Sequence, residues 1–424
     1  MRRIVVAGAA MTAGLAVAAS TTGFGPGPGR DPAGAAGSAE VAGGQKAPVS
    51  AGQFDHSVAR AYAFLNLMMD RYAAGSTPRL AQSFTGGVLE QQGFTSSVTY
   101  DDAVVIDAYL AEGTRAGRAR AEAIGDGLLY VQDHDPAHDG RIRAAYAPNP
   151  LLGPGDVDAT DPATMAGALA WAGQALVQLY AATGRAEYLA GAEAIGNWVQ
   201  AHCHDVRGAG GYTGGETAAG QQIEWKSTEH NIDLYVLFSL LARETGGPVW
   251  SARAAWARRF IAAMWNGQQG YFDVGTTGDG VTPNTALLPE DVNSWSFLAL
   301  RDRAYAASVT WIARNLAVTE GGFSGVSYCT GDRSGVWFEG TAHLADALEL
   351  RGEPGDDALA ARFLADIYNA QAHGPNGDGL GIIAASRDGL SDCTGGSHYA
   401  SLHTGATAWY ILAAKKINPF LLIS

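Results

Sequence analysis

The sequence predicts an all-α fold, a toroid with six inner and six outer helices. Six segments rich in Ala, Leu and aromatic residues each follow a polar or Gly-containing loop. Their starts lie roughly 45–65 residues apart, a spacing that holds two helices and their connections. Amphipathic segments alternate with them. An alternation of fully buried and half-buried helices is what two concentric rings require.

The six predicted inner helices share a polar start and an apolar body. The third is apolar on every side between Ile232 and Leu241, as a helix that is covered all round must be. The segments begin near Tyr100 (YDDAVVIDAYLA), Thr164 (TMAGALAWAGQAL), Ser227 (STEHNIDLYVLFSLLA), Asp291 (DVNSWSFLAL), Val336 (VWFEGTAHLADAL) and Ser401 (SLHTGATAWYILAA).

The predicted outer helices have one solvent-facing side. In residues 250–265, apolar residues recur at helical spacing, while Arg258 and Arg259 fall between them. A first helix over about residues 54–73 supplies the outer partner that closes the ring. Gly-rich stretches follow the outer helices and let the chain turn into the next inner one, at Gly210–Gly215, Gln269–Gly275, Gly321–Tyr328 and Asn376–Ile383.

The N-terminus has the form of an export signal. Arg2 and Arg3 precede an uncharged stretch that closes on small residues, so residues 1–20 are predicted to be a signal peptide, and the arginine pair leaves twin-arginine export open. Residues 21–52 are mostly Gly, Ala, Pro and Ser and are predicted to be a disordered leader. Residues 53–424 then form a single toroid domain, which we expect to be secreted.

Charge and composition exclude several partners. The chain carries 42 acidic and 28 basic residues, a net charge of −14, which disfavours nucleic acid as a partner. No apolar stretch is long enough to span a membrane in the mature form. The acidic run at residues 156–161 lacks the Gly and distal Glu of a calcium loop, so we expect no metal and no cofactor. The oligomeric state is left open.

Three cysteines point to one disulfide and one buried thiol. Cys329 and Cys393 lie in similar loops, Tyr-Cys-Thr-Gly and Asp-Cys-Thr-Gly, which precede neighbouring hairpins. We therefore predict that these two pair and that Cys203 stays free.

The six hairpins, the aromatic Gly-rich turns and the motifs STEHNIDLY, VWFEGTAHLADAL and GATAWYILA together resemble bacterial members of the six-hairpin glycosidase superfamily, the (α/α)6 barrels. The likeness covers nearly all of the mature chain. It implies a carbohydrate substrate and a cleft formed where the inner helices begin. It does not decide the reaction, because this toroid carries hydrolases, lyases, epimerases and cyclases.

Hydrolysis of a glycosidic bond needs two carboxyl groups, one protonated and one ionised. Glu339 stands in an apolar stretch, where an unpaired carboxylate is costly. Glu229 begins the third inner segment, and Asp101 and Asp102 begin the first. We predict that Glu229 and Glu339 are the catalytic pair, supported by Asp101 or Asp102. The alternative for each is an ordinary acidic residue that stabilises a helix N-terminus.

Further residues at the predicted inner N-termini are candidates for substrate binding. Flat tryptophan faces stack on sugar rings, and the polar groups bind hydroxyls or carboxylates. Lys226 is one of only four lysines and is expected to pair with Glu229 or with a substrate carboxylate. The predicted substrate-binding residues are Tyr100, Trp225, Lys226, His230, Asp233, Asn293, Trp295, Trp337 and His403.

The leading hypothesis is therefore a secreted glycoside hydrolase that acts on an extracellular poly- or oligosaccharide. A polysaccharide lyase on the same fold would use His230, His403 and Tyr399 as base and acid, with Lys226 against a uronate. A sugar epimerase on this fold and a non-catalytic glycan-binding toroid are also compatible with the sequence. Sugar identity, linkage and stereochemistry are left open.

Overall fold

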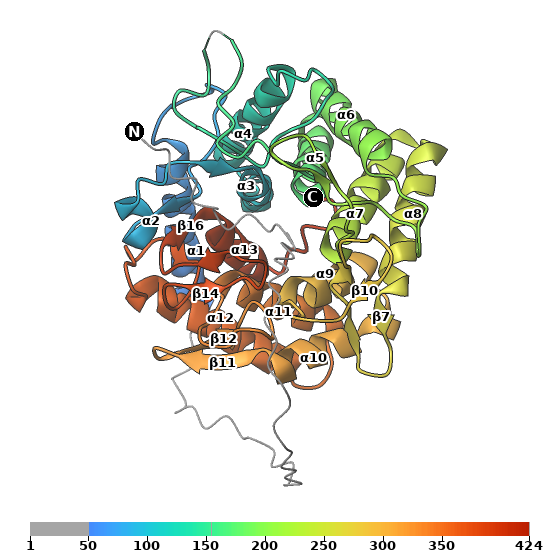
Figure 1. Cartoon of the computed structure of the whole chain (residues 1–424). Coiled ribbons are helices and arrows are strands. Elements are labelled where there is room, and N and C mark those ends of the chain that lie inside the picture. The colour runs from blue at the N-terminus through green and yellow to red at the C-terminus, as the bar shows by residue number, and fades with distance from the viewer. Residues whose placement is uncertain (1–50, 154, 424) are drawn as a thin grey trace, which may run out of the picture.

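The computed structural model describes residues 51–153 and 155–423 (Figure 1). The predicted signal peptide and nearly all of the predicted leader lie outside these residues. The first helix, α1 (Ala51–Met69), begins about three residues before the start that the sequence suggests. Among the helices of residues 51–153 and 155–423, none combines the length and the hydrophobicity of a membrane-spanning segment.

Six helices form the inner ring. Each contacts the next along the chain, and the last contacts the first, so the ring is closed. The sequence prediction of a six-by-six helical toroid is confirmed, and the six starts lie within a few residues of the expected positions. The inner helices are α3 (Thr99–Glu112), α5 (Ala166–Thr183), α7 (Thr228–Thr245), α9 (Glu290–Leu300), α11 (Phe338–Arg351) and α13 (Thr404–Ala414).

The outer helices pack against the inner ring. Each lies against the inner helix that adjoins it in sequence, except that α1 packs against the last inner helix and closes the toroid. They are α1, α4 (Arg115–Asp133), α6 (Ala186–His202), α8 (Pro248–Ala263), α10 (Ala307–Asn315) and α12 (Asp356–His373). Two short helices, α2 (Gly87–Gln91) and η1 (Arg303–Tyr305), lie in loops.

Local sequence sets where several helices begin and end. Ser227 caps α7, because its side chain accepts a hydrogen bond from the His230 amide. Gly184 and Gly246 end α5 and α7 in the left-handed conformation, which glycine adopts without a Cβ penalty. Inner and outer helices can therefore be joined by very short turns at this end of the toroid.

Short antiparallel strands occupy the loops at the other end, where the sequence suggests only Gly-rich turns. The small sheets that they form are β1 (Phe84–Thr85), β16 (Leu402–His403) and β13 (Ile382–Ile383); β4 (Thr164–Met165), β5 (Gly215–Glu216) and β6 (Gln222–Ile223); β2 (Ser97–Val98) with β3 (Ala145–Tyr146); β7 (Trp265–Asn266) with β8 (Tyr271–Phe272); β9 (Gly275–Thr276) with β10 (Pro283–Asn284); β11 (Ala317–Glu320) with β12 (Phe323–Val326); and β14 (Leu390–Ser391) with β15 (Ser397–His398). Most pairs are hairpins within one loop, whereas β1 with β16, β2 with β3, and β4 with β5 join neighbouring loops.

The C-terminal segment after α13 closes the toroid at the end opposite to the starts of the inner helices. Phe420 packs against Trp171, Trp295 and Trp409, with ring centroids 5.3, 5.7 and 6.3 Å away. The side chain of Gln178 on α5 donates to the carbonyls of residues 419 and 421 and accepts from the amide of residue 423. The axis of the ring is thus filled by an aromatic layer, and the opposite end, where the inner helices begin, is left for a cleft.

The predicted disulfide is confirmed. Cys329 and Cys393 are bonded, and Cys203 is a buried free cysteine. The bond ties the loop before α11 to the loop between β14 and β15. Two loops at the mouth of the toroid are therefore held together covalently.

Candidate active site

Carboxyl groups converge at the first turns of the inner helices. Asp101, Glu229, Glu290, Asp291 and Glu339 come from four of these helices, and at most 4 % of each residue is exposed. A buried carboxylate costs free energy unless it is hydrogen-bonded, paired with a cation or protonated. Such a concentration of acids marks the mouth of the toroid as the candidate active site.

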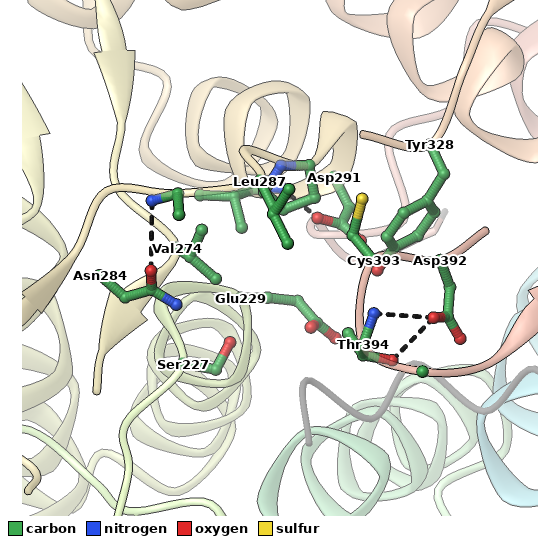
Figure 2. A pocket seen from close by; sticks show the side chains of 14 residues that line it. Ser227, Glu229, Val274, Asn284, Leu287, Asp291, Tyr328, Asp392, Cys393 and Thr394 are labelled. Carbon is green, nitrogen blue, oxygen red and sulfur yellow. Dashed lines mark hydrogen bonds between the residues drawn. The ribbon is translucent and has the colours of Figure 1, made fainter. Parts of the chain in front are cut away.

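A cavity of about 380 Å³ opens at this mouth (Figure 2). Its walls come from α7, α9, the β9–β10 region and the disulfide-anchored loop. Glu229 and Asp291 contribute carboxyl groups to it from two neighbouring inner helices. The lining residues are Ser227, Glu229, Val274, Asn284, Ala286, Leu287, Pro289, Asp291, Val292, Tyr328, Asp392, Cys393, Thr394 and Gly395.

Glu229, Asp233 and Asp291 form an electrostatically coupled cluster of acids, of which Glu229 and Asp291 line the cavity. Burial, followed by repulsion from Asp291 and Asp233, raises the pKa of Glu229 well above its usual range. Burial also raises the pKa of Asp291 to about 6, although a hydrogen bond from the Val292 amide opposes the shift. The cluster therefore holds protons near neutral pH, as a general acid must.

Glu339 is the centre of a second cluster. The Tyr100 hydroxyl donates a 2.6 Å hydrogen bond to its Oε1, and the indole of Trp409 donates to that hydroxyl at 2.7 Å. The Nδ1 atom of His403 lies 3.4 Å from Glu339 Oε2, and Nε2 of His343 lies 3.7 Å from Oε1. These partners come from two other inner helices and from the next turn of α11.

The two imidazoles link Glu339 to two more carboxyl groups. His403 contacts Asp101 at 3.0 Å and stacks on Phe84 with ring centroids 4.1 Å apart. His343 contacts Glu290 at 3.1 Å. The row Asp101, His403, Glu339, His343 and Glu290 alternates acid and imidazole across four inner helices.

Protonation in this row is set by burial and by charge. Burial raises the pKa of Glu339 to about 7, while the nearby His403 opposes the rise. Burial alone would lower the pKa of His403, but Asp101 and Glu339 outweigh it and raise the pKa above the usual value. Glu339 is therefore poised to gain or lose a proton near neutral pH.

Asp102 does not face the cleft. Its two oxygens accept hydrogen bonds from the Ala81 amide at 2.9 Å and from the Ser97 hydroxyl at 2.6 Å. These contacts anchor the strand region before α3. Of the predicted pair, Asp101 contacts His403 beside Glu339, whereas both Asp102 oxygens bind the chain before α3, which disfavours a catalytic role for Asp102.

Lys226 and Asn293 also have structural partners. The Lys226 ammonium donates to the Arg207 carbonyl at 2.8 Å and lies 3.4 Å from Asp205, so within the described residues it does not form the expected pair with Glu229. The Asn293 side chain accepts from the Phe272 amide and donates to the Pro289 carbonyl. Each side chain binds a neighbouring loop, and neither lines the cavity.

The three predicted tryptophans have different surroundings. Trp295 is fully buried in the aromatic layer beneath the site, and Trp337 is 1 % exposed against Tyr328 and His398, so neither offers the flat face expected at the mouth. Trp225 is 8 % exposed beside Met165 and Ile223. Among these three, Trp225 alone keeps a surface for a sugar.

The remaining predicted residues are buried near the starts of the inner helices. Tyr100 and His403 belong to the Glu339 cluster described above. His230 is buried beside Trp225, with ring centroids 5.5 Å apart. Asp233 lies one turn below Glu229 on α7. Tyr399, which a lyase would use, packs instead against a small apolar cluster around Phe84 and Leu89.

Sequence reasoning missed Glu290, His343, Tyr328 and Asp392 as site residues. Glu290 directly precedes Asp291, the residue at which the sequence placed the start of the fourth inner segment. His343 stands four residues after Glu339, the spacing that places two side chains on one helix face, so this signal was present in VWFEGTAHLADAL. Tyr328 and Asp392 lie in the two disulfide-linked loops, whose place at the mouth depends on the closed ring.

Comparison with solved structures identifies the fold. A D-mannose isomerase aligns with a TM-score of 0.62 at 13 % identity, covering 87 % of this chain and 97 % of its own. The cellobiose 2-epimerase of Bacillus thermoamylovorans aligns with a TM-score of 0.64 at 10 % identity, covering 85 % and 99 %. The chain has the (α/α)6 six-hairpin fold.

A glycosidase variant solved with glucose aligns with a TM-score of 0.59 at 15 % identity, covering 86 % of this chain and 97 % of that one. No protein-family model and no curated protein sequence matches this chain. The similar structures therefore span hydrolysis, isomerisation and epimerisation of sugars, and at these identities they show the fold alone.

Proposed function

We propose that this protein is a secreted glycoside hydrolase that acts on an extracellular poly- or oligosaccharide, with Glu229 and Glu339 as its carboxyl pair. One observation carries the proposal. Both glutamates are buried in the first turn of an inner helix at the same end of the toroid, and Asp291 interacts electrostatically with both. Two such groups on opposite sides of a bound sugar are what cleavage of a glycosidic bond requires.

The surroundings of the two glutamates suit different roles. Glu229 makes no hydrogen bond to another described residue, and repulsion from neighbouring acids favours its protonated form. It is the general acid that donates a proton to the leaving oxygen. Glu339 accepts a hydrogen bond from Tyr100 and lies beside His403, which favours its ionised form. It is the general base that activates water, and Asp101 orients His403 against it.

Inverting hydrolysis follows from this assignment, because a water molecule must fit between the base and the sugar. It requires carboxyl groups about 6.5–9.5 Å apart, whereas retention requires about 5–5.5 Å. A lyase is less well supported, because cleavage of a polyuronate calls for a cation near the substrate carboxylate, and Lys226 is engaged with Asp205. A protein that only binds glycans would not need protonated carboxyl groups in its cleft, because it transfers no proton.

Isomerisation or epimerisation is the second candidate. His403 lies between Asp101 and Glu339, so its ring can take and return a proton at the carbon beside a sugar carbonyl. The structural similarity to D-mannose isomerase and cellobiose 2-epimerase also supports this second candidate. This reaction changes the sugar without breaking a glycosidic bond.

One experiment separates these functions. The purified protein is incubated with a panel of glycans, and new reducing ends, ultraviolet-absorbing double bonds and deuterium uptake at C2 in heavy water are measured together. We expect new reducing ends only. Double bonds would indicate a lyase, deuterium uptake an epimerase or isomerase, and binding without any product a binding protein.

The carboxyl pair is then tested by substitution. Glu229→Gln and Glu339→Gln keep shape but lose the ionisable group, so each should lower kcat by about 10²–10⁴-fold while the helical circular dichroism is unchanged. Glu187→Gln, at an exposed position on α6, is the matched control and should keep full activity. Full activity in either of these two variants would remove that residue from the proposed pair.

Export is tested separately. Sequencing the N-terminus of the protein recovered from culture medium shows whether a signal peptide has been removed.

A further inference from the structure

The cavity wall carries acids and no cation. Glu229, Asp291 and Asp392 line it, and none of its other lining residues is Lys, Arg or His. The apolar part of the wall, including Val274 and Leu287, lowers the local dielectric constant and strengthens the effect of each charge. A ligand in this cavity therefore meets carboxyl groups and no cationic side chain.

Two cationic side chains beside the start of α7 have other partners. Lys226 adjoins Ser227, which lines the cavity, but its ammonium contacts Asp205 and the Arg207 carbonyl. Arg207 itself pairs with Asp205 and Glu224. Neither side chain is free to turn into the cavity and neutralise it.

One buried carboxylate oxygen on the wall has no donor of normal hydrogen-bond geometry among the described residues. Asp291 is fully buried, and within the described residues its Oδ2 makes no hydrogen bond of normal geometry, although Tyr328 lies beside it. Glu229 has no hydrogen-bond partner among these residues either. Asp392 is held differently: its Oδ1 accepts from the amide and hydroxyl of Thr394 at 2.8 and 2.9 Å, as Figure 2 shows, and from the Gly396 amide at 2.9 Å.

The three donors on Oδ1 hold the Asp392 carboxyl group in one orientation and leave its second oxygen for another partner. The disulfide holds the whole loop in place, because Cys393 follows Asp392 directly and is bonded to Cys329. Asp392 is thus an oriented acceptor at the rim, separate from the proposed catalytic glutamates.

We propose that the cavity selects sugars by charge, and that the preferred substrate is a glycan with free amino groups. An ammonium substituent finds carboxyl acceptors at Asp392 and Asp291, a hydroxyl finds the same acceptors with a weaker hydrogen bond, and a uronate carboxylate finds no cation on the wall. The affinity order is amine, then neutral sugar, then uronate. This inference rests on the proposed function, because it describes the ligand of the same cleft.

The test uses sugars that differ only in charge. Binding of the methyl glycosides of glucosamine, glucose and glucuronate to the wild-type protein is measured by calorimetry near pH 6, with the galactose and mannose series in parallel because the preferred ring stereochemistry is open. We expect the amine to bind about ten-fold more tightly than the neutral sugar, the uronate not to bind, and the preference to shrink in high salt. N-acetylation of the amine should remove the advantage.

Substitution at the rim locates the selectivity. Asp392→Asn should bring the affinity for the amine down to that for the neutral sugar, whereas Asp357→Asn on the exposed side of α12 should change neither. If the Asp392→Asn variant folds poorly, the effect of salt on the preference of the wild-type protein for the amine tests the charge selection independently.

The failures of the two proposals are distinguishable. Equal affinities for amine and neutral sugar, or tighter binding of the uronate, overturn the charge selection. If neutral glycans are still cleaved, the proposed hydrolase function stands without charge selection. An absence of binding by every sugar, together with no cleavage of any glycan, overturns both proposals.

Discussion

The Tyr100 hydroxyl donates a 2.6 Å hydrogen bond to Glu339, although 239 residues separate them in the sequence. Tyr100 lies in the first turn of the first inner helix and Glu339 in that of the fifth, and the Trp409 indole on the sixth donates to the same hydroxyl. Three inner helices thus meet at one carboxyl group. Its protonation depends on the closure of the ring as well as on its own helix.

Removing the Tyr100 hydroxyl should shift the pH profile. The hydrogen bond stabilises the ionised form of Glu339, whose pKa burial raises to about 7, so Tyr100→Phe should raise this pKa further. The activity limb that reports Glu339 should move to higher pH, while the fold is kept. Tyr130→Phe, whose hydroxyl donates to the Gly153 carbonyl far from the cleft, is the control. Identical profiles for wild type and Tyr100→Phe would show that the hydroxyl does not act on Glu339.

Asp346 should make the protein less stable at alkaline pH. It lies on α11 two turns below Glu339, and burial, aided by Glu349, raises its pKa to about 7. Because the same carboxyl group in the unfolded chain ionises near pH 3.8, the free energy of unfolding falls as pH rises from about 4 to 7 and then levels off.

The side chain introduced by Asp346→Asn cannot ionise, so the fall in the free energy of unfolding that Asp346 causes between about pH 4 and 7 is lost. The variant should be more stable than wild type at pH 8 by roughly 1–3 kcal/mol and similar to it at pH 4. Urea unfolding at the two values measures the difference. Parallel stability curves across this range would argue that Asp346 finds a cationic partner or water on ionisation.

The disulfide should contribute both stability and cleft geometry. Cys329 and Cys393 are 64 residues apart, so removing the bond with Cys329→Ser and Cys393→Ser should cost ~4 kcal/mol on the chain-entropy model. Because Asp392, Thr394 and Gly395 line the cavity, KM should rise more than kcat falls. Cys203→Ala is the control, since that thiol is unpaired. A double variant with unchanged KM would mean that the loop holds its place without the bond.

Trp225 and Trp295 should respond differently to truncation. Trp225→Ala should weaken glycan binding while the helical signal persists, because this ring keeps some exposure beside His230. Trp295→Ala removes a fully buried ring from the aromatic layer and should cost about 3–5 kcal/mol of unfolding free energy. Calorimetry and thermal unfolding of both variants give the comparison. Normal binding by Trp225→Ala would assign that residue to the core as well.

Much of the fold was determined by the sequence itself. Helical periodicity and Gly-rich breaks are local signals, so the starts of inner helices such as α3 and α11 could be predicted within about two residues. The disulfide pair followed from two similar loops. The buried acids could be identified because Glu229 and Glu339 stand at the N-terminal ends of otherwise apolar helices.

The tertiary structure alone decided which of these residues share a site. Asp101 and Asp102 are neighbours in sequence, yet one residue is a rotation of about 100° on a helix, so only Asp101 meets His403 while Asp102 holds the chain before α3. The partner of Lys226, the burial of Trp295 and the arrival of Asp392 at the cavity likewise depend on helix rotation and loop contacts across the closed ring. Such long-range contacts leave no periodic trace in the sequence, because each is made by residues whose spacing along the chain carries no information about their distance in space.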